Sequence, residues 1–253
     1  MADPGELPVP RFGSLVTVMC LLLAAACGGT SGHDGSHRIT VADIRSTDFA
    51  LLPCAPSMPD APCVLAVAGG KRLLFGTPAG LRAGLDPDTL ASLDAVLLFS
   101  LQGPDVEGLD EVRNAGWTAG REGPLPVGGP AGTRDTAAAL NKAYELSDAQ
   151  IFVKTPPRGG FGAALLGVLP GEGDAKGRVF DTGDLVVTKI ETGDGMAGYW
   201  IDYGGKRVVL QPCGMDNAVR FNEVESFTVT CGGEGGSRWP LTNLKFLVQG
   251  ANP

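Results

Sequence analysis

Short apolar runs separated by glycine and proline recur along the chain, a pattern typical of strands rather than of a helical bundle. Residues 64–68 and 71–75 are two such runs, and they flank Gly69-Gly70 as in a β-hairpin. Residues 95–101 are apolar almost throughout, as expected for a strand covered on both faces. Residues 38–44 predict the first strand of the chain.

Helices are predicted between these strands. Asp86 can cap a helix whose first position is Pro87. A short helix is expected over residues 107–114, where apolar residues recur every three positions. The clearest helix covers residues 133–146, because its apolar positions recur at three and four: Ala137, Leu140 and Tyr144. A brief strand is expected in "GPLPVGGPAGT", before this last helix. After the first strand, the predicted order is therefore strand, strand, helix, strand, helix, strand, helix.

The second part of the chain is predicted to be made of strands. A second hairpin is expected around Gly204-Gly205, and the tail at residues 227–248 predicts two more strands and no helix. The paired hairpins indicate two similar halves that face each other. The other predicted strands are residues 151–153, 178–180, 185–190, 198–203 and 207–212.

Composition and charge narrow the class of protein. The 253 residues are 43% hydrophobic and 19% charged, which is enough for a substantial core. The formal net charge is −8, and the 20 Lys and Arg residues are scattered without a dense basic run. Nucleic acid is therefore not an expected partner, because binding it requires clustered positive charge.

The amino terminus predicts export. Residues 15–26 form an apolar run of twelve residues that ends in alanines. This is shorter than the roughly 20 residues that cross a bilayer, and it is typical of a signal-peptide core. The ending Ala24-Ala25-Ala26-Cys27 resembles a bacterial lipobox, in which Cys27 is lipidated. We therefore expect a lipoprotein signal peptide at residues 1–26 and a lipid anchor on Cys27. The anchor would hold the protein to a membrane of the bacterial cell envelope, with the domain facing the periplasm or exterior. A cleaved ordinary signal peptide and a buried helix are the alternatives.

A flexible tether is expected at residues 27–38, followed by a single domain at residues 39–253. The tether is rich in glycine and serine, and it contains both histidines of the chain, His33 and His37. A segment of this composition does not hold a fixed metal geometry. The predicted domain thus has no histidine.

Four cysteines remain in the predicted domain: Cys54, Cys63, Cys213 and Cys231. An even number in an exported protein predicts disulfides, and four cysteines allow three pairings. Short loops favour Cys54 with Cys63 and Cys213 with Cys231. Neither pair has the Cys-x-x-Cys spacing of a zinc site.

Four segments in their order resemble the metallo-β-lactamase fold, in the branch that holds RNase Z, the cyclic-phosphonate phosphodiesterases and the pyrroloquinoline-quinone accessory protein. They are "VLAVAGGKRLLFGTPAGLRAGL", "LDAVLLFSLQGPDVEGLDEVR", "LPVGGPAGTRDTAAALNKAYE" and "GDLVVTKIETGDGMAGYWIDYGGKRVVL". The resemblance implies an α/β fold, an αββα sandwich of two mixed β-sheets. Because forty residues follow Cys213, a shortened C-terminal half is expected, with the outer helix layer on that side missing or replaced.

The same resemblance implies a metal motif, His-x-His-x-Asp-His, after the strand that ends near Leu98. This chain has Ser100 and Gln102 at the two histidine positions, Pro104 at the aspartate and Asp105 at the last histidine. Two further aspartate positions of the family correspond to Gly76 and Cys213. Such a set does not hold a transition metal firmly, since zinc sites need converging imidazoles and carboxylates. No metal and no cofactor are therefore expected. Ca²⁺ bound through Asp105 and Glu107 is an alternative.

Hydrolysis without a metal has little support in the sequence. A serine nucleophile needs a positioned base, and Ser100 has no histidine or nearby lysine in sequence. The loop "GGPAGT" before the long helix could present amides to an anion, but a tight turn is the simpler interpretation.

Three functions follow from these patterns. The first is a membrane-anchored, non-catalytic protein that binds a protein or a small molecule. The second is a hydrolase of phosphodiester or ester bonds with an altered site at Ser100, Gln102, Asp105 and Glu107. The third is an envelope interaction module whose disulfide-stapled loops carry the partner surface.

Overall fold

A computed structural model describes residues 41–54, 62–171, 174–215, 226–231 and 237–250. The chain divides into two compact units, Met1–Arg38 and Ile39–Pro253, and the described residues all belong to the second. The predicted signal peptide, the tether and Cys27 lie outside the described residues.

The first sheet has seven strands in the order β13-β1-β2-β3-β4-β5-β6. Its strands from β13 to β3 pair antiparallel, and those from β3 to β6 pair parallel, so the sheet is mixed. Its strands are β1 (Phe49–Pro53), β2 (Val64–Ala68), β3 (Lys71–Phe75), β4 (Ala95–Leu97), β5 (Leu125–Gly128), β6 (Leu166–Val168) and β13 (Lys245–Val248).

The second sheet has six strands in the order β12-β11-β10-β9-β8-β7. It is also mixed, because β7 to β10 pair antiparallel while β10, β11 and β12 pair parallel. Its strands are β7 (Lys176–Asp181), β8 (Val186–Glu191), β9 (Ala197–Tyr203), β10 (Lys206–Leu210), β11 (Ser226–Thr230) and β12 (Ser237–Arg238).

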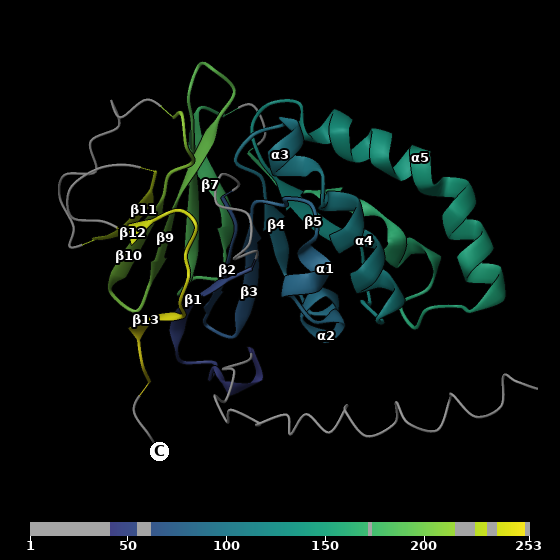
Figure 1. The fold of residues 1–253 in the computed structure, drawn as a ribbon, viewed down its shortest axis with the longest axis horizontal. Coiled ribbons are helices and arrows are strands. Elements are labelled where there is room, and N and C mark those ends of the chain that lie inside the picture. Colours follow the sequence, from purple (N-terminus) through teal and green to yellow (C-terminus); the bar gives the residue numbers. More distant parts are fainter. Residues whose placement is uncertain (1–40, 55–61, 172–173, 216–225, 232–236, 251–253) are drawn as a thin grey trace, which may run out of the picture. The chain divides into compact units, whose positions relative to one another are not determined.

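The described α-helices lie on the side of the first sheet that faces away from the second sheet (Figure 1). Apolar side chains of α1, α2 and α4 pack with β2, β4 and β5 in one buried cluster. Among the described residues, no helix has the length and apolar character needed to cross a membrane. The helices are η1 (Val41–Asp43), α1 (Leu81–Gly84), α2 (Pro87–Ala91), α3 (Gly103–Val106), α4 (Leu109–Thr118), α5 (Thr133–Lys154) and η2 (Phe161–Ala164).

A second buried cluster fills the space between the two sheets. It joins side chains of β1 to β4 with side chains of β7 to β11, and it includes Phe75, Phe99 and Tyr199. The alternation of strand side chains explains both clusters, because successive residues of β2 and β4 point to the helices and to the second sheet in turn.

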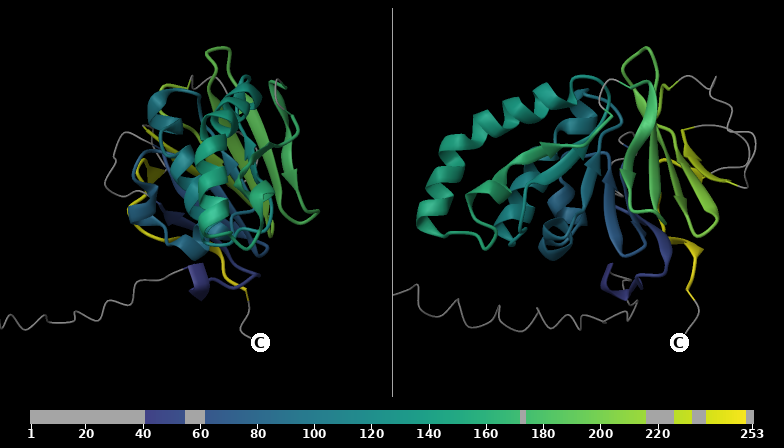
Figure 2. Two further views of the ribbon diagram at one scale, coloured as in Figure 1. Left: turned by 90° about the vertical axis from the view of Figure 1, so that its right-hand side faces the viewer. Right: turned by 180° about the vertical axis from the view of Figure 1, so that it is seen from behind.

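No described helix covers the outer face of the second sheet (Figure 2). The two mixed sheets and their flanking helices confirm the predicted metallo-β-lactamase-like sandwich. The helix layer that an αββα sandwich would have on this face is not present among the described residues.

Both predicted hairpins are confirmed. β2 pairs with β3 across Gly69-Gly70, and β9 pairs with β10 across Gly204-Gly205. All four glycines have positive φ, which the tight turns require. The cap of α2 is confirmed as well, because the Asp86 carboxylate accepts a hydrogen bond from the Thr89 amide at 2.9 Å.

The predicted first strand at residues 38–44 is wrong within its described part. Val41–Asp43 is a 3₁₀ helix, and the first strand is β1. The Asp48 carboxylate accepts a hydrogen bond from the Arg45 amide at 2.9 Å, which fixes a turn directly before Phe49. The extended chain therefore starts only after this turn.

The predicted strand at residues 151–153 is also wrong. These residues form the last turns of α5, which runs to Lys154. Ile151 and Phe152 pack against a small buried cluster around Trp117, so tertiary contacts keep this β-branched and aromatic segment helical. The predicted helix at residues 107–114 corresponds to α4, which begins at Leu109 and continues to Thr118, and the short helix α3 precedes it. The described part of the tail has three strands instead of the predicted two.

Both predicted disulfides are present. Cys54 pairs with Cys63, with their Cα atoms 5.8 Å apart, and Cys213 pairs with Cys231, with their Cα atoms 5.1 Å apart. The first closes the connection from β1 to β2, and the second joins the segment after β10 to the end of β11. Both pairs connect neighbouring strands.

Candidate functional site

The segment that follows β4 forms a closed turn around Ser100. The Ser100 hydroxyl donates a hydrogen bond to the Asp105 carboxylate, and its oxygen accepts one from the Gln102 amide at 3.1 Å. Ser100 and Asp105 are 2% and 7% exposed. The two buried residues at motif positions are therefore bonded to each other rather than directed toward a ligand.

The backbone of this turn is held by the end of β3. The Thr77 hydroxyl and amide both donate to the Asp105 carbonyl, at 2.7 Å and 3.1 Å. The Gly108 amide in turn donates to the Thr77 carbonyl at 2.8 Å. These bonds fix the position of α3 relative to the sheet, so the turn is a rigid part of the fold.

Burial raises the pKa of the Asp105 carboxyl group, and the hydrogen bond from Ser100 opposes this effect. No cation is paired with the Asp105 carboxylate among the described ion pairs. The environment thus disfavours the charge that a metal ligand carries.

Gly76 has no room for the aspartate that the family resemblance would place there. Its φ is +75°, and a Cβ atom on it would lie 1.9 Å from the carbonyl oxygen of Pro62. Its amide donates to the Leu97 carbonyl at 2.9 Å, which brings the ends of β3 and β4 together. The backbone itself therefore excludes a ligand from this position.

The remaining predicted positions are not brought together as a site. The side chains of Gln102, Pro104 and Glu107 are exposed, whereas Asp105 is buried, and Cys213 is in a disulfide. Within the described residues, no three His, Cys, Asp or Glu side chains are grouped so that they could hold a metal ion. The donors present do not fit the two zinc ions implied by the fold family.

Aromatic side chains occupy the space between the sheets beside this turn. The ring centroids of Phe75 and Tyr199 are 5.2 Å apart, and those of Phe99 and Trp239 are 5.7 Å apart. The Tyr199 hydroxyl donates to the Leu98 carbonyl at 2.5 Å, and the Phe99 carbonyl accepts a hydrogen bond from the Ala197 amide at 2.7 Å. The second sheet is thus bonded directly to the end of β4, and the interior there is filled.

A buried lysine that the sequence pattern does not single out extends from β8 of the second sheet to the end of β5 in the first sheet. Lys189 is fully buried, and its ammonium group donates to the Gly129 carbonyl at 3.1 Å and to the Glu191 carboxylate at 2.8 Å. Gly129 follows the end of β5, next to Leu98, whose amide donates to the Gly128 carbonyl at 2.8 Å. The Lys189 ammonium group therefore places a positive charge at the end of β5, where it is paired with Glu191.

Glu191 also explains the loop "GGPAGT". Its carboxylate accepts a hydrogen bond from the Ala131 amide at 3.0 Å, so this loop amide is bonded to the protein's own carboxylate. Burial raises the pKa of Tyr199 well above its usual value, and the charges of Glu191 and Asp105 act in the same direction. The loop is a turn that packs on the second sheet, as the simpler interpretation of the sequence predicted.

No protein-family model matches the chain. No curated protein matches its sequence either. Solved structures described as having the metallo-β-lactamase fold are similar to the chain at low sequence identity. Human tRNase Z, short form, is 16% identical, with a TM-score of 0.46, and the match covers 66% of this chain and 69% of that one.

Two further structures are similar at the same level. The metallo-β-lactamase fold protein YhfI from Bacillus subtilis is 16% identical, with a TM-score of 0.48 and coverage of 72% of this chain and 70% of that one. A diphosphatase from the PhnP family is 14% identical, with a TM-score of 0.41 and coverage of 65% and 59%. At TM-scores below 0.5, the activities of these proteins say nothing about the activity of this chain.

Proposed function

We propose that this chain is a non-catalytic binding or interaction protein, exported and lipid-anchored through Cys27, on a metallo-β-lactamase-like fold. The observation that carries the proposal is the closed edge of the first sheet at the end of β4. There Ser100 and Asp105 are bonded to each other, and Lys189 is bonded to Glu191.

The chemistry of these groups supports the proposal. A di-zinc hydrolase needs several imidazoles and carboxylates on each metal, as well as an open position for water. Ser100 and Gln102 offer neutral oxygens, and Asp105 is a single buried carboxyl group with a raised pKa. The buried rings of Phe75, Phe99 and Tyr199 pack against one another beside the turn.

The experiment that tests the proposal measures zinc and hydrolysis on the same full-length chain. After incubation with zinc and removal of free metal, we expect far less than one zinc per chain by elemental mass spectrometry. About two zinc ions per chain would contradict the proposal, because that is the content of a working two-metal site.

Hydrolysis of bis-p-nitrophenyl phosphate and p-nitrophenyl acetate is measured in parallel. We expect the wild-type chain and its Asp105→Ala variant to give the same rate as buffer. A wild-type rate above buffer that is lost in Asp105→Ala would support the alternative function, a phosphodiester or ester hydrolase with an altered site.

The two disulfides support an oxidising compartment outside the cytoplasm, since such bonds persist mainly in exported proteins. A lipid anchor at Cys27 is the simplest way to hold an exported domain at the envelope.

A further inference from the structure

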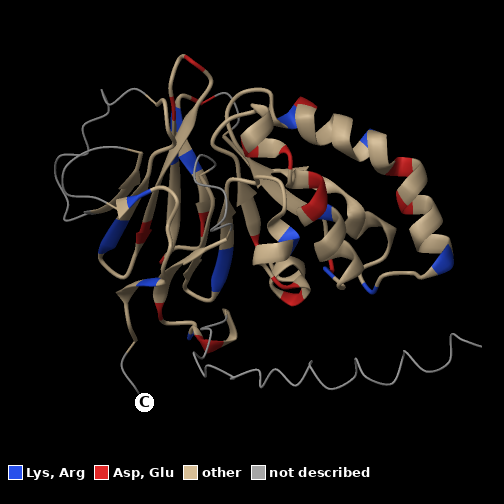
Figure 3. Cartoon of the chain, viewed as in Figure 1, with Lys and Arg blue, Asp and Glu red and all other residues tan. Residues whose placement is uncertain are grey.

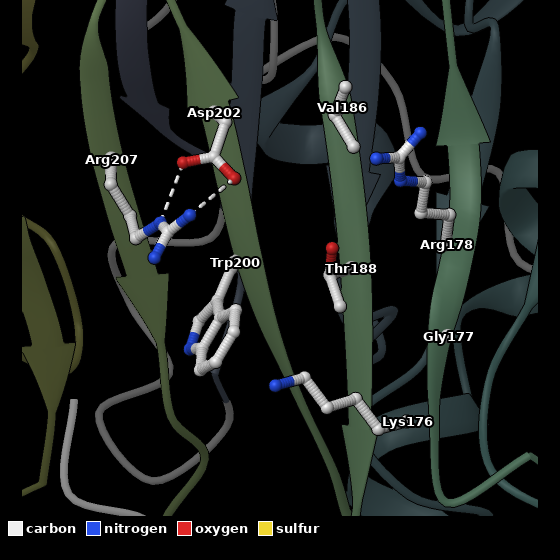
Figure 4. A pocket seen from close by; sticks show the side chains of 8 residues that line it. All are labelled: Lys176, Gly177, Arg178, Val186, Thr188, Trp200, Asp202 and Arg207. Atoms are coloured by element: carbon white, nitrogen blue, oxygen red, sulfur yellow. Dashed lines mark hydrogen bonds and ion pairs between the residues drawn. The ribbon is translucent and has the colours of Figure 1, made fainter.

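A hollow of about 510 Å³ lies on the outer face of the second sheet, the face that no described helix covers (Figure 4). It extends across β7, β8, β9 and β10 of the second sheet, whereas the turn at Ser100 follows β4 of the first sheet. Residues that line it include Lys176, Arg178, Thr188, Trp200, Asp202 and Arg207.

Strand register places these side chains on one face. Trp200 of β9 pairs with Thr188 of β8, and Thr188 pairs in turn with Arg178 of β7. The neighbours of Trp200 in β9, Tyr199 and Ile201, are fully buried between the sheets. Because side chains alternate along a strand, Trp200 and Asp202 point outward.

Two cations contact the indole ring of Trp200. The Lys176 ammonium lies 4.4 Å from the ring centroid, and the Arg207 guanidinium lies 4.9 Å from it. Arg207 is also held by Asp202 in a bidentate pair, at 2.6 Å and 3.0 Å. The ring thus fixes two positive groups close together on the sheet face.

The hollow carries an excess of positive charge on a chain whose net charge is −8. Three cations line it, Lys176, Arg178 and Arg207, and two of them have carboxylate partners: Asp202 pairs with Arg207, and the exposed Asp181 pairs with Arg178. Figure 3 shows blue Lys and Arg positions on the strands of this sheet. A clustered positive patch on an acidic protein attracts a negatively charged partner.

Lys176 and Arg178 are available for such a partner. Both side chains are exposed, and Lys176 has no ion pair within the part of the chain that the structure describes. Arg178 pairs with Asp181 at 3.1 Å, but both partners are exposed, so this pair contributes little and can be exchanged.

We propose that an acidic segment of a protein partner binds this hollow. The hollow is open along the sheet face, whereas small-molecule sites are concave and enclose most of their ligand. Tryptophan and arginine are the residues that most often dominate protein interfaces. Acidic side chains of the partner pair with Lys176 and Arg178, next to the fixed ring of Trp200.

The inference rests on the proposed interaction role, and it is tested with a separate probe. A fluorescently labelled decapeptide of alternating Glu and Gly is titrated with the full-length chain, and anisotropy is measured. We expect binding that weakens as salt is added, because exposed charges are screened. The K176A/R178A variant is expected to bind about tenfold more weakly or worse, since two charge-assisted contacts are lost.

The matched control is the K142A/K154A variant, which removes the same charge from α5. Its affinity for the peptide is expected to equal that of the wild type, and circular dichroism checks that both variants are folded.

Absence of peptide binding, or an equal loss of affinity in both variants, would overturn the inference. Binding to phosphatidylglycerol vesicles instead of the peptide would also overturn it, by pointing to a membrane surface. None of these outcomes alters the zinc and hydrolysis results, so a failure here is distinguishable from a failure of the proposed function.

Discussion

Two buried aspartates show how neighbouring groups decide the charge of the same side chain. Burial raises the pKa of Asp48, but hydrogen bonds from the Gly250 amide, the Arg45 amide and the Arg45 guanidinium outweigh burial, so that its pKa is lowered. Burial also raises the pKa of Asp105, and there only Ser100 opposes it, so the pKa stays raised. Charged donors and amides thus stabilise one carboxylate and are missing at the other.

These shifts predict opposite dependences of stability on pH. Because the folded pKa of Asp48 is lowered, its stabilising effect is present above the pKa of the unfolded chain and is lost as pH falls through the folded pKa. Because the folded pKa of Asp105 is raised, its protonated form stabilises the fold at low pH, and this effect is lost as pH rises through the folded pKa. In urea unfolding, Asp48→Asn is expected to lower the free energy of unfolding most near neutral pH. For Asp105→Asn, the free energy of unfolding is expected to rise relative to that of the wild type as pH increases above about 4.

Each variant serves as the control of the other, since both changes remove one buried carboxyl group. Curves of unfolding free energy against pH that shift in the same direction for both variants would contradict the assignment.

At the scale of elements, a buried ion pair holds α5 against α4. Both side chains of Arg113 and Asp148 are almost fully buried, and one of their bonds measures 3.1 Å. The Tyr144 ring lies 5.3 Å from the Arg113 guanidinium, and its hydroxyl donates to Asp110 of α4. Polar contacts therefore join these two helices, in addition to the apolar face of α5, whose Ala137 lies in one buried cluster with Val112 of α4.

Asp148→Ala is expected to lower the free energy of unfolding by about 3–5 kcal/mol, because it leaves a buried guanidinium without its partner. The control is Glu145→Ala on the exposed side of α5, where the pair with Lys142 is open to solvent. Its expected cost is below about 1 kcal/mol. Similar losses for the two variants in urea unfolding would show that the Arg113–Asp148 pair has no special role.

The elements that could be predicted are those defined by local signals. The Gly69-Gly70 and Gly204-Gly205 turns and the Asp86 cap each depend on neighbouring residues, and all three are confirmed. The strand predicted at residues 38–44 overlooks the local turn between Arg45 and Asp48. The helical end at Ile151 depends on contacts with the distant cluster around Trp117, whereas its residues alone predict a strand. Local propensity does not include such contacts.

At the scale of the whole molecule, the sequence shows that the metal-binding histidines of the metallo-β-lactamase motif are replaced by other residues. It does not show which groups then lie together at the end of β4. Lys189 lies in an apolar run that predicts only a strand, and its partner Gly129 is sixty residues away in the chain. The exposed hollow around Trp200 likewise depends on the register of four strands and on the uncovered sheet face. Both features need the assembled sandwich.

The export of the molecule is testable through its cysteines. Expressed in a bacterium that processes lipoproteins, the wild-type chain is expected in the membrane fraction, with a mass that reflects loss of residues 1–26 and gain of acyl chains. Cys27→Ser is expected to lose the acylated mass and its stable attachment, because a lipid anchor supplies about 0.8 kcal/mol per buried methylene. The control is Cys20→Ser, a change within the predicted leader, and this variant should fractionate like the wild type.

The disulfides are tested separately by alkylation. Without a reductant, we expect the four paired cysteines to resist alkylation in the folded and unfolded chain, as their pairing requires: Cys54, Cys63, Cys213 and Cys231.

Two outcomes of the fractionation would contradict the lipid anchor. If wild type and Cys27→Ser are both soluble and shortened, the leader is an ordinary cleaved signal peptide, and if both keep the full-length mass at the membrane, it is an uncleaved helix. Either result would remove the lipid anchor from the proposal and leave the closed site at Ser100 and Lys189 unaffected.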